Sequence, residues 1–377
     1  MDVLIVYAKA GAGHLSAAEA VYHAFKRQNP AENVAIIDCL DYTPAWFKRF
    51  YPTVYIFLVR YLSLLWQAIY YSLENRFIYS LIRPLRRLNN RMVTKRLAEF
   101  IKKEKPQVII STQFFASEVV ASLKRGRETN AALISIVTDF GAHTFWESDQ
   151  VDIFVVASEY TKQDLIRRGM PEAKIRILGI PIEPPLKGAN KLELRRQIGL
   201  RQELFTVLTV GGGFGVGPIK ELVFSLDSLK PEIKKRIQLI VVCSKNKNLY
   251  AEIEKILPRL NMGLKLFGFV EDLYKMMSAS DIIISKSGGL TTSESLASGL
   301  PMIIISPIPG QESKNCALLV EKGAAIEIKR AFEAKGIIES LLNHPERLQD
   351  MRRQARMLSR PDSALEAAKL AKAYLRS

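Results

Sequence analysis

A histidine follows two glycines near the start of the chain, in the stretch AKAGAGHLSAAEA at residues 8–20. An apolar run of strand length, VLIVY, precedes this stretch, and helix-forming residues end it. In such a strand–turn–helix unit, Gly11 and Gly13 permit a tight turn, and the first helical N–H groups are free to bind an anion. His14 lies where the turn meets the helix. The motif therefore predicts an imidazole that acts as a base or a hydrogen-bond donor at a strand end.

A second candidate base follows another apolar run. The stretch TDFGAHTFW, residues 138–146, comes directly after LISIV, so Asp139 is expected at the carboxyl end of a strand. Open parallel sheets bind ligands at that edge. Asp139 could there deprotonate a hydroxyl nucleophile, or it could cap a helix. His143 and Trp146 lie in the loop beyond it.

Three loops in the second half carry residues suited to phosphates and hydroxyls. The glycine-rich stretch TVGGGFGVGPIKEL, residues 209–222, lies between a strand pattern and a helix pattern, as in a phosphate-binding turn. Residues 285–301, SKSGGLTTSESLASGLP, place Glu294 early in a helix, where it could accept both hydroxyls of a ribose or merely favour the helix N-terminus. The third loop, PGQESKN, offers polar side chains for the hydroxyls of a sugar: Gln311, Glu312 and Asn315.

Strand patterns and helix patterns alternate in both halves of the chain, which predicts parallel sheets covered by helices on both faces. The alternation breaks at GIPIEPPLKGAN, residues 179–190, which is rich in proline and glycine. We therefore expect two doubly wound α/β domains, at residues 1–183 and 184–358, followed by a helix at residues 359–377.

Residues 42–98 do not fit this alternation. They contain ten Lys or Arg and a single acid, Glu74, and twelve aromatic residues occur between positions 46 and 79. A bilayer span is disfavoured because Arg60 and Gln67 interrupt the apolar run and both flanks are basic. Docking in the membrane interface is favoured, and a helix pair with core aromatics is the alternative. The docking residues expected from the sequence are Trp46, Phe47, Phe57, Arg60, Trp66, Arg83, Arg86 and Arg87.

The composition limits the partners and the compartment. The 377 residues include 54 Lys and Arg against 38 Asp and Glu, a net charge of +16, which favours a polyanion: nucleic acid, an anionic bilayer or nucleotide phosphates. No nucleic-acid-binding signature occurs, so we expect no such partner. Three scattered cysteines predict neither a disulfide framework nor a zinc site, and no DxD pair calls for a metal. With no signal-peptide pattern, we expect a cytoplasmic protein on the inner face of the cell membrane.

These motifs together resemble a known family. The set GAGH, TDF with HxxW, GGGFGVGP, FGFVEDL, SKSGGLTTSESLASGLP and PGQESKN is similar to the monogalactosyldiacylglycerol synthases and the bacterial processive diacylglycerol glucosyltransferases. More distantly it resembles the N-acetylglucosaminyltransferase that completes lipid II. The resemblance covers roughly residues 2–345.

The resemblance implies a GT-B fold: two Rossmann-like domains facing a central cleft, with a C-terminal helix that packs back on the first domain. His14 and Asp139 would flank the acceptor hydroxyl, either one as the base, with the acceptor-binding residues Gly13, His143 and Trp146 nearby. A nucleotide sugar would be bound by Gly212, Gly213, Phe214, Gly215, Phe269, Val270, Ser287, Gly288, Gly289, Glu294, Gln311, Glu312 and Asn315.

The implied activity is inverting transfer of a hexose from UDP-glucose or UDP-galactose to diacylglycerol at a membrane surface, without a metal cofactor. An alternative acceptor is a polyprenyl-linked or already glycosylated lipid. A nucleic-acid-binding protein is the alternative from another class, and it is disfavoured because the basic residues lie among apolar aromatics. Residue types alone leave the donor epimer and the oligomeric state open.

Overall fold

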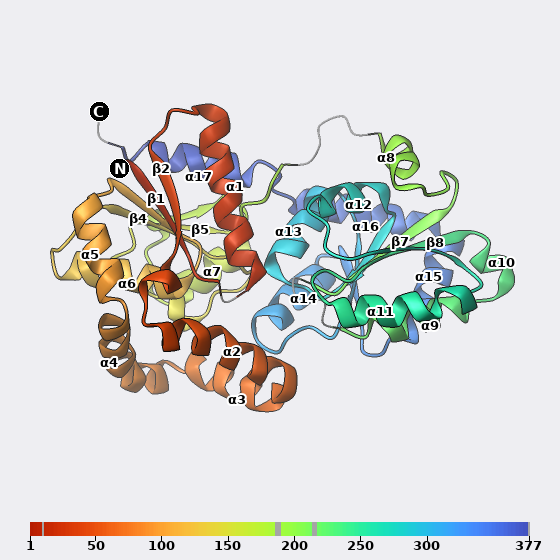
Figure 1. The fold of residues 1–377 in the computed structure, drawn as a ribbon, viewed down its shortest axis with the longest axis horizontal. Coiled ribbons are helices and arrows are strands. Elements are labelled where there is room, and N and C mark those ends of the chain that lie inside the picture. The colour runs from red at the N-terminus through yellow and green to blue at the C-terminus, as the bar shows by residue number, and fades with distance from the viewer. Residues whose placement is uncertain (10, 185–189, 213–216, 376–377) are drawn as a thin grey trace. The chain divides into compact units, whose positions relative to one another are not determined.

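The computed structural model describes the chain except for residues 10, 185–189, 213–216 and 376–377, and it gives the backbone alone at positions 12, 60 and 76. The chain divides into two compact units (Figure 1). Unit 1 contains residues 1–183, 308–314 and 360–377. Unit 2 contains residues 184–307 and 315–359. Each unit is built on its own sheet, so each is described by itself.

Unit 1 contains a six-stranded parallel sheet in the order β2-β1-β3-β4-β5-β6. Its strands are β1 (Val3–Tyr7), β2 (Val34–Asp38), β3 (Val108–Ser111), β4 (Ala132–Ile136), β5 (Ile153–Val156) and β6 (Ile175–Ile177). The chain runs from β1 to β2 on one side and then returns past β1 to form β3. The topological switch point, where open α/β sheets bind ligands, therefore lies between β1 and β3.

Helices cover both faces of this sheet. They are α1 (Ala12–Gln28), α5 (Lys95–Glu104), α6 (Phe114–Arg125), α7 (Glu159–Arg167) and α17 (Ser363–Lys372), with short 3-10 turns η1 (Cys39–Tyr42), η2 (Thr144–Trp146) and η3 (Glu172–Lys174). Figure 1 shows α17, in blue, alongside α1, in red. The contact face of α17 consists of buried alanines spaced as one helical stripe: Ala364, Ala367, Ala368 and Ala371. Such small side chains let two helices approach closely.

Residues 42–98, which we call the atypical segment, contain three further helices of unit 1: α2 (Ala45–Tyr61), α3 (Ser63–Glu74) and α4 (Arg76–Val93). They gather at the lower end of the unit in the view of Figure 1. Among the described residues no single helix has both the length and the apolar character needed to cross a bilayer. By length and composition alone, α2 and α3 qualify only as a pair, with a bend of 110° between them.

Unit 2 contains a second six-stranded parallel sheet, in the order β12-β11-β10-β7-β8-β9. Its strands are β7 (Phe205–Val210), β8 (Ile237–Val242), β9 (Gly263–Phe267), β10 (Ile282–Ser285), β11 (Met302–Ile305) and β12 (Ala325–Ile328). The order reverses between β7 and β10, which gives this sheet its own switch point. The predicted fold class, two doubly wound parallel-sheet domains, is confirmed.

Ten helical segments accompany this sheet along the chain. They are α8 (Lys191–Ile198), α9 (Ile219–Asp227), α10 (Pro231–Lys234), α11 (Lys247–Ile256), η4 (Leu257–Arg259), α12 (Leu273–Ala279), α13 (Gly289–Ala297), α14 (Gln311–Glu321), α15 (Glu333–Asn343) and α16 (Pro345–Leu358). The first residues of α14 belong to the segment 308–314 of unit 1, and the rest of α14 belongs to unit 2.

Asp281, directly before β10, ties two helices to the sheet of unit 2. Its carboxylate accepts from Lys191 Nζ at 2.6 Å and Arg195 at 2.5 Å on α8, and from Arg352 at 2.7 Å on α16. The backbone N–H of Thr206 donates to it as well, at 2.8 Å. Burial opposes ionisation of this carboxyl, but the cations, Lys191 foremost, outweigh burial and lower its pKa. The charge of Asp281 therefore stabilises the packing of α8 and α16.

We expect Asp281→Asn to lower the free energy of unfolding by about 3 kcal/mol, because it leaves three cations without their partly buried anion. Urea unfolding measures this change. The matched control is Asp350→Asn on α16, which breaks an exposed pair with Arg353 and should cost less than about 1 kcal/mol. Equal losses in the two variants would contradict the role given to Asp281.

Candidate functional site

His14 lies at the switch point of unit 1, where β1 ends and α1 begins. Its Nδ1 lies 2.8 Å from the carbonyl oxygen of Thr112, which directly follows β3. In return, the Thr112 hydroxyl donates to the carbonyl oxygen of His14, also at 2.8 Å. These reciprocal hydrogen bonds join the ends of two neighbouring strands. The loop after β1 is thereby fixed to the loop after β3.

The partner of Nδ1 decides the tautomer of His14. A carbonyl oxygen only accepts hydrogen bonds, so Nδ1 carries the proton and Nε2 carries a lone pair. The Thr138 hydroxyl lies 3.1 Å from the same Nδ1. Burial lowers the pKa of the imidazole to about 4, although the bond to Thr112 partly opposes the shift. At neutral pH, His14 is therefore an uncharged base whose free lone pair is on Nε2.

Asp139 follows Thr138 just beyond the end of β4, and its side chain is half-buried. Thr138, the residue before Asp139, contacts the His14 ring, so the residues that follow β1 and β4, on either side of β3, meet at the same edge of the sheet. Burial first, and then negative charges that include Asp139, raise the pKa of Tyr55 on α2 and Tyr70 on α3. The Asp139 carboxylate therefore lies within electrostatic reach of two phenols of the atypical segment.

His143 and Trp146 are both buried within unit 1, and their predicted acceptor-binding role stays a prediction. His143 Nε2 donates to the carbonyl oxygen of Tyr70 at 3.3 Å, and its Nδ1 accepts from the N–H of Phe145 at 3.2 Å. Burial lowers the pKa of this imidazole to about 3. Trp146 is buried in the core of unit 1, edge-on to Phe114. The sequence shows that both residues lie in the loop after β4, but it does not show which way their side chains point. Gly13, a partly exposed residue of the first turn of α1, stays a prediction.

The glycine loop of unit 2 begins at the carboxyl end of β7. Gly212 has a φ of +64°, which favours glycine, and its carbonyl oxygen accepts from Ser244 Oγ at 2.9 Å. Ser285 Oγ, at the end of β10, donates to the carbonyl oxygen of Val210 at 2.9 Å. This bond joins β7 and β10 at the switch point. Three predicted members of the loop, Gly213, Phe214 and Gly215, lie outside the described residues.

Glu294 lies on α13, the helix that follows β10. Gly288 caps this helix with an extended backbone, and Gly289 is its first residue. Burial raises the pKa of the Glu294 carboxyl to about 7. Within the described part of the chain, no group donates a hydrogen bond to this carboxylate or pairs with it. Glu294 is therefore an acceptor in a low-dielectric site, with no donor among the residues that the structure describes.

Asn315 and Ser287 support the turn before α13. Both side chains are fully buried, and Asn315 Nδ2 donates to the carbonyl oxygen of Ser287 at 2.8 Å. The amide nitrogen of Asn315 thus holds the β10–α13 turn, and the predicted contact of Asn315 with a hexose stays a prediction.

The other two polar residues of the third loop, Gln311 and Glu312, belong to the segment 308–314 of unit 1. Glu312 Oε2 accepts from the N–H of Ile308 at 2.7 Å and so closes its own turn. Gln311 Nε2 donates to the Tyr55 hydroxyl at 2.9 Å, and Gln311 Oε1 is buried with no hydrogen bond to a described residue. Gln311 thus retains an acceptor for a ligand, whereas Glu312 is a capping residue.

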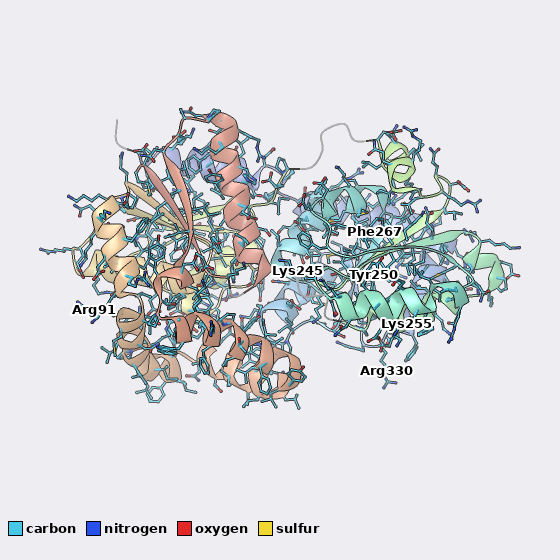
Figure 2. The ribbon with its side chains drawn as sticks, in the orientation of Figure 1. Arg91, Lys245, Tyr250, Lys255, Phe267 and Arg330 are labelled. Atoms are coloured by element: carbon cyan, nitrogen blue, oxygen red, sulfur yellow. The ribbon has the colours of Figure 1, made fainter. Side chains whose placement is uncertain are left out.

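Phe269 presents an aromatic ring beyond the end of β9. The side chain is 62% exposed, the adjacent Val270 is partly exposed, and Lys245 Nζ lies 5.3 Å from the Phe269 ring centroid. Figure 2 labels Lys245 and Tyr250, which belong to the chain between β8 and the end of α11. Sequence reasoning missed Lys245. The signal was available, because a lysine in the loop after a buried strand lies at the ligand-binding edge.

Part of the predicted docking surface belongs instead to the core of unit 1. Phe47 is buried, stacked on Tyr51 and Phe115. Trp66 Nε1 donates to the carbonyl oxygen of Pro309 at 3.1 Å, and its side chain is partly buried. Phe47 is therefore a core residue, as in the alternative of core aromatics, whereas the docking role of the partly buried Trp66 stays a prediction.

Arg86, also predicted to dock at a membrane, makes contacts within unit 1. Its guanidinium pairs with Glu118 at 2.7 Å and lies 4.4 Å from the Phe145 ring centroid. It therefore anchors α4 to α6 and η2. The Arg60 side chain lies outside the described part of the structure.

An exposed apolar stripe runs along α4. Its members recur at helical spacing and each is more than half exposed: Phe77, Leu81, Leu85, Leu88 and Met92. Trp46 and Phe57 on α2 are also more than half exposed. The opposite face of α4 contacts the body of unit 1 through Tyr79 and Asn90, both buried. The docking residues expected from the sequence include Trp46 and Phe57 but none of the apolar stripe of α4, whose helical spacing was the available signal.

The described residues contain no group of three or more His, Cys, Asp or Glu side chains that could hold a metal ion.

Comparison with known proteins identifies the family. Residues 14–182 match the Monogalactosyldiacylglycerol (MGDG) synthase family, and residues 206–373 match the Glycosyltransferase family 28 C-terminal domain. The chain is 30% identical over 371 residues to the processive diacylglycerol beta-glucosyltransferase of Bacillus cytotoxicus, covering 96% of this chain and 91% of that protein. The Bacillus licheniformis protein of the same name is 28% identical over 367 residues, with coverages of 96% and 92%.

Solved structures share the fold. MurG of Acinetobacter baumannii superposes with a TM-score of 0.60 at 15% identity and 99% coverage of both chains. HepE of Anabaena, in complex with UDP-glucose, gives a TM-score of 0.55 at 12% identity and full coverage of both chains. Two parallel sheets with this strand order, and these relatives, define the GT-B fold. The chain therefore belongs to the glycosyltransferase family of the MGDG synthases and processive diacylglycerol beta-glucosyltransferases.

Proposed function

We propose that this protein is an inverting hexosyltransferase that moves glucose from UDP-glucose to the free hydroxyl of diacylglycerol at a membrane surface. The observation that carries the proposal is the neutral His14 with a free Nε2 lone pair at the switch point of unit 1. The relatives that match nearly the whole chain are named for glucosyl transfer to diacylglycerol, which favours glucose over galactose.

The proposed chemistry is a direct displacement. His14 Nε2 accepts the proton of the glycerol hydroxyl while its oxygen attacks the anomeric carbon, and the bond from that carbon to the UDP oxygen breaks on the opposite face. An α-linked donor thus gives a β-glucoside. The Thr112 carbonyl stabilises the imidazolium that forms, because it already accepts from Nδ1. Asp139, at the same edge of the sheet, is the alternative base for the same hydroxyl.

The donor would bind at the switch point of unit 2. Ribose hydroxyls suit the Glu294 carboxylate, which has no protein donor among the described residues. The exposed Phe269 ring offers a surface on which a uracil could stack, with Lys245 beside it. Backbone amides of the loop after β7 and the N-terminus of α13 would stabilise the departing diphosphate.

Docking at the membrane would use α4. Its exposed stripe is the pattern of a helix that lies in the interface with its apolar face toward the acyl chains. The surrounding basic residues would add attraction to an anionic leaflet of about 1 kcal/mol each. The protein would then be peripheral, on the cytoplasmic face, where nucleotide sugars are available.

Transfer from radiolabelled UDP-glucose, and separately UDP-galactose, to diacylglycerol in mixed vesicles tests the proposal. We expect labelled β-glucosyldiacylglycerol from UDP-glucose alone. Label from UDP-galactose alone would overturn the choice of donor. UDP binding without labelled lipid from either donor would overturn the acceptor and favour a polyprenyl-linked or glycosylated lipid, the acceptor class of the alternative.

His14→Gln should lower kcat by about 100-fold or more, because it removes the base while the KM for the donor stays nearly unchanged. In the unmodified enzyme the base remains unprotonated until the pH falls to about 4, so the rate should show no acid limb near pH 6.5. His23→Gln, an exposed position on the same helix, is the control and should change kcat less than twofold. A rate within threefold of the unmodified enzyme for His14→Gln would contradict this role.

Glu294→Gln should raise the KM for UDP-glucose by about tenfold, because a neutral amide binds hydroxyl donors more weakly than a carboxylate. Since the carboxyl titrates at about 7, the KM of the unmodified enzyme should rise as pH falls from about 8 to about 6, and the variant should lose this dependence. Glu254→Gln, exposed on α11, should alter neither property. An unchanged KM profile in Glu294→Gln would rule out the ribose contact.

The double substitution Leu81→Ser and Leu85→Ser should weaken binding to phosphatidylcholine vesicles by about tenfold or more, because each exposed leucine loses burial worth about 1.5 kcal/mol or more. Vesicle flotation measures the binding. The control removes two exposed apolar side chains elsewhere, by Leu192→Ser and Phe332→Ser, and should leave binding unchanged. Equal loss in both pairs would show that α4 is not the docking helix.

A further inference from the structure

A cavity of about 570 Å³ opens between α4 and the loops that flank η2 and α7 in unit 1. Its wall combines arginines from three elements with two acids: Arg83, Arg87, Arg125, Arg168, Glu147 and Asp149. Four guanidiniums therefore face one cavity with two carboxylates. We call this cavity the arginine pocket.

Arg168 is committed to the protein. Its guanidinium pairs with Glu74 at 3.1 Å and Glu147 at 3.4 Å, and it is largely buried. It forms a fixed wall of the arginine pocket and anchors the end of α3. The negative charges of Glu74 and Glu147 already neutralise this guanidinium, so we do not assign it to a ligand.

The other three arginines are poorly neutralised. Arg83 has no ion pair or hydrogen bond with any described residue. Arg87 Nε lies 4.0 Å from Glu118, whose nearer partner at 2.7 Å is Arg86. Arg125 pairs at 3.2 Å with Asp149, a carboxylate that is itself mostly exposed. These guanidiniums thus retain donors for a further anion.

The three cations also crowd one another. Burial lowers the pKa of Arg87, and the positive charges of Arg83 and Arg125 lower it further. The three cations repel one another, and a bound anion would offset this repulsion. Ser148 adds a hydroxyl: its oxygen accepts from the N–H of Gln150 at 3.3 Å, which leaves its own proton free to donate.

We propose that the arginine pocket binds a phosphate group. Guanidinium forks match the tetrahedral oxyanion and can each donate two hydrogen bonds to it. Two sources offer this chemistry: the headgroup of an anionic phospholipid and a soluble phosphate monoester. The lipid source rests on the proposed function, because it requires α4 to lie at a bilayer; the soluble source does not.

The experiment replaces guanidinium groups of the arginine pocket with ammonium groups, which keep the positive charge. Arg83→Lys with Arg87→Lys retains two cations but loses bidentate geometry. The matched control is Arg91→Lys with Arg96→Lys at exposed positions at the end of α4 and the start of α5, where Figure 2 shows Arg91 at the outer edge of unit 1. A third variant, Asp149→Asn, removes the carboxylate that competes for Arg125.

Binding is measured by flotation with phosphatidylcholine vesicles, with and without phosphatidylglycerol, and by calorimetric titration with glycerol 3-phosphate. We expect the Arg83 and Arg87 pair to lose at least about tenfold of the phosphate-dependent affinity, the control to change less than twofold, and Asp149→Asn to gain about threefold. Loss in both assays would assign the pocket to phosphate in either form, and loss in the vesicle assay alone would assign it to lipid.

Equal behaviour of the two lysine pairs in both assays would overturn the pocket and leave only diffuse attraction. Transfer of glucose to diacylglycerol in phosphatidylcholine vesicles is measured in parallel on the unmodified enzyme. Absent transfer there would overturn the proposed function and not the pocket. Unfolding midpoints of the variants confirm that each has folded.

Discussion

The hydrogen bond from His14 Nδ1 to the carbonyl oxygen of Thr112 is the interaction on which the chemistry of unit 1 depends. It exists because β1 and β3 are parallel neighbours, so the residues after both strands meet at one edge. It selects the tautomer with a free Nε2. Burial then keeps that nitrogen unprotonated at neutral pH. Strand order, turn and tautomer therefore form one causal sequence.

In unit 2 a hydrogen bond between strand ends likewise fixes a switch point, and the titratable group beside it is the carboxyl of Glu294. At its switch point the bond from Ser285 to the Val210 carbonyl joins the two strands, and Glu294 lies on the helix that follows. Burial again sets the charge, but it raises the pKa of a carboxyl where in unit 1 it lowers that of an imidazole. Both shifts favour the neutral form, as desolvation requires. The imidazole thereby becomes a usable base, and the carboxyl becomes a group whose ionisation is coupled to a ligand.

The sequence sufficed for the sheets and for the loops at their carboxyl ends, because apolar runs and glycine turns are local signals. It also placed His14 and Asp139 at the same edge. It could not show which way each side chain turns. His143 and Asn315 occupy the predicted loops, yet their side chains turn inward to bind the carbonyl oxygens of Tyr70 and Ser287.

The atypical segment shows the same limit. Its composition indicated helices at an interface. Phe47 is nevertheless buried in the core and Leu81 is exposed, and residue type does not distinguish these two apolar side chains. Only the contacts of α2 with α6 and the spacing along α4 separate the two faces. The arginine pocket likewise depends on residues far apart in sequence, such as Arg83 and Arg125, so spacing could not reveal it.

The most direct test of this account is ¹⁵N NMR of the imidazoles, since the chain has four histidines and single substitutions assign them. We expect His14 to carry its proton on Nδ1, with Nε2 bare, and to stay neutral until the pH approaches about 4. His143 is an internal contrast, because it should carry its proton on Nε2. A His14 signal with the proton on Nε2, or one that titrates near pH 6.5, would contradict the assignment of His14 as the poised base.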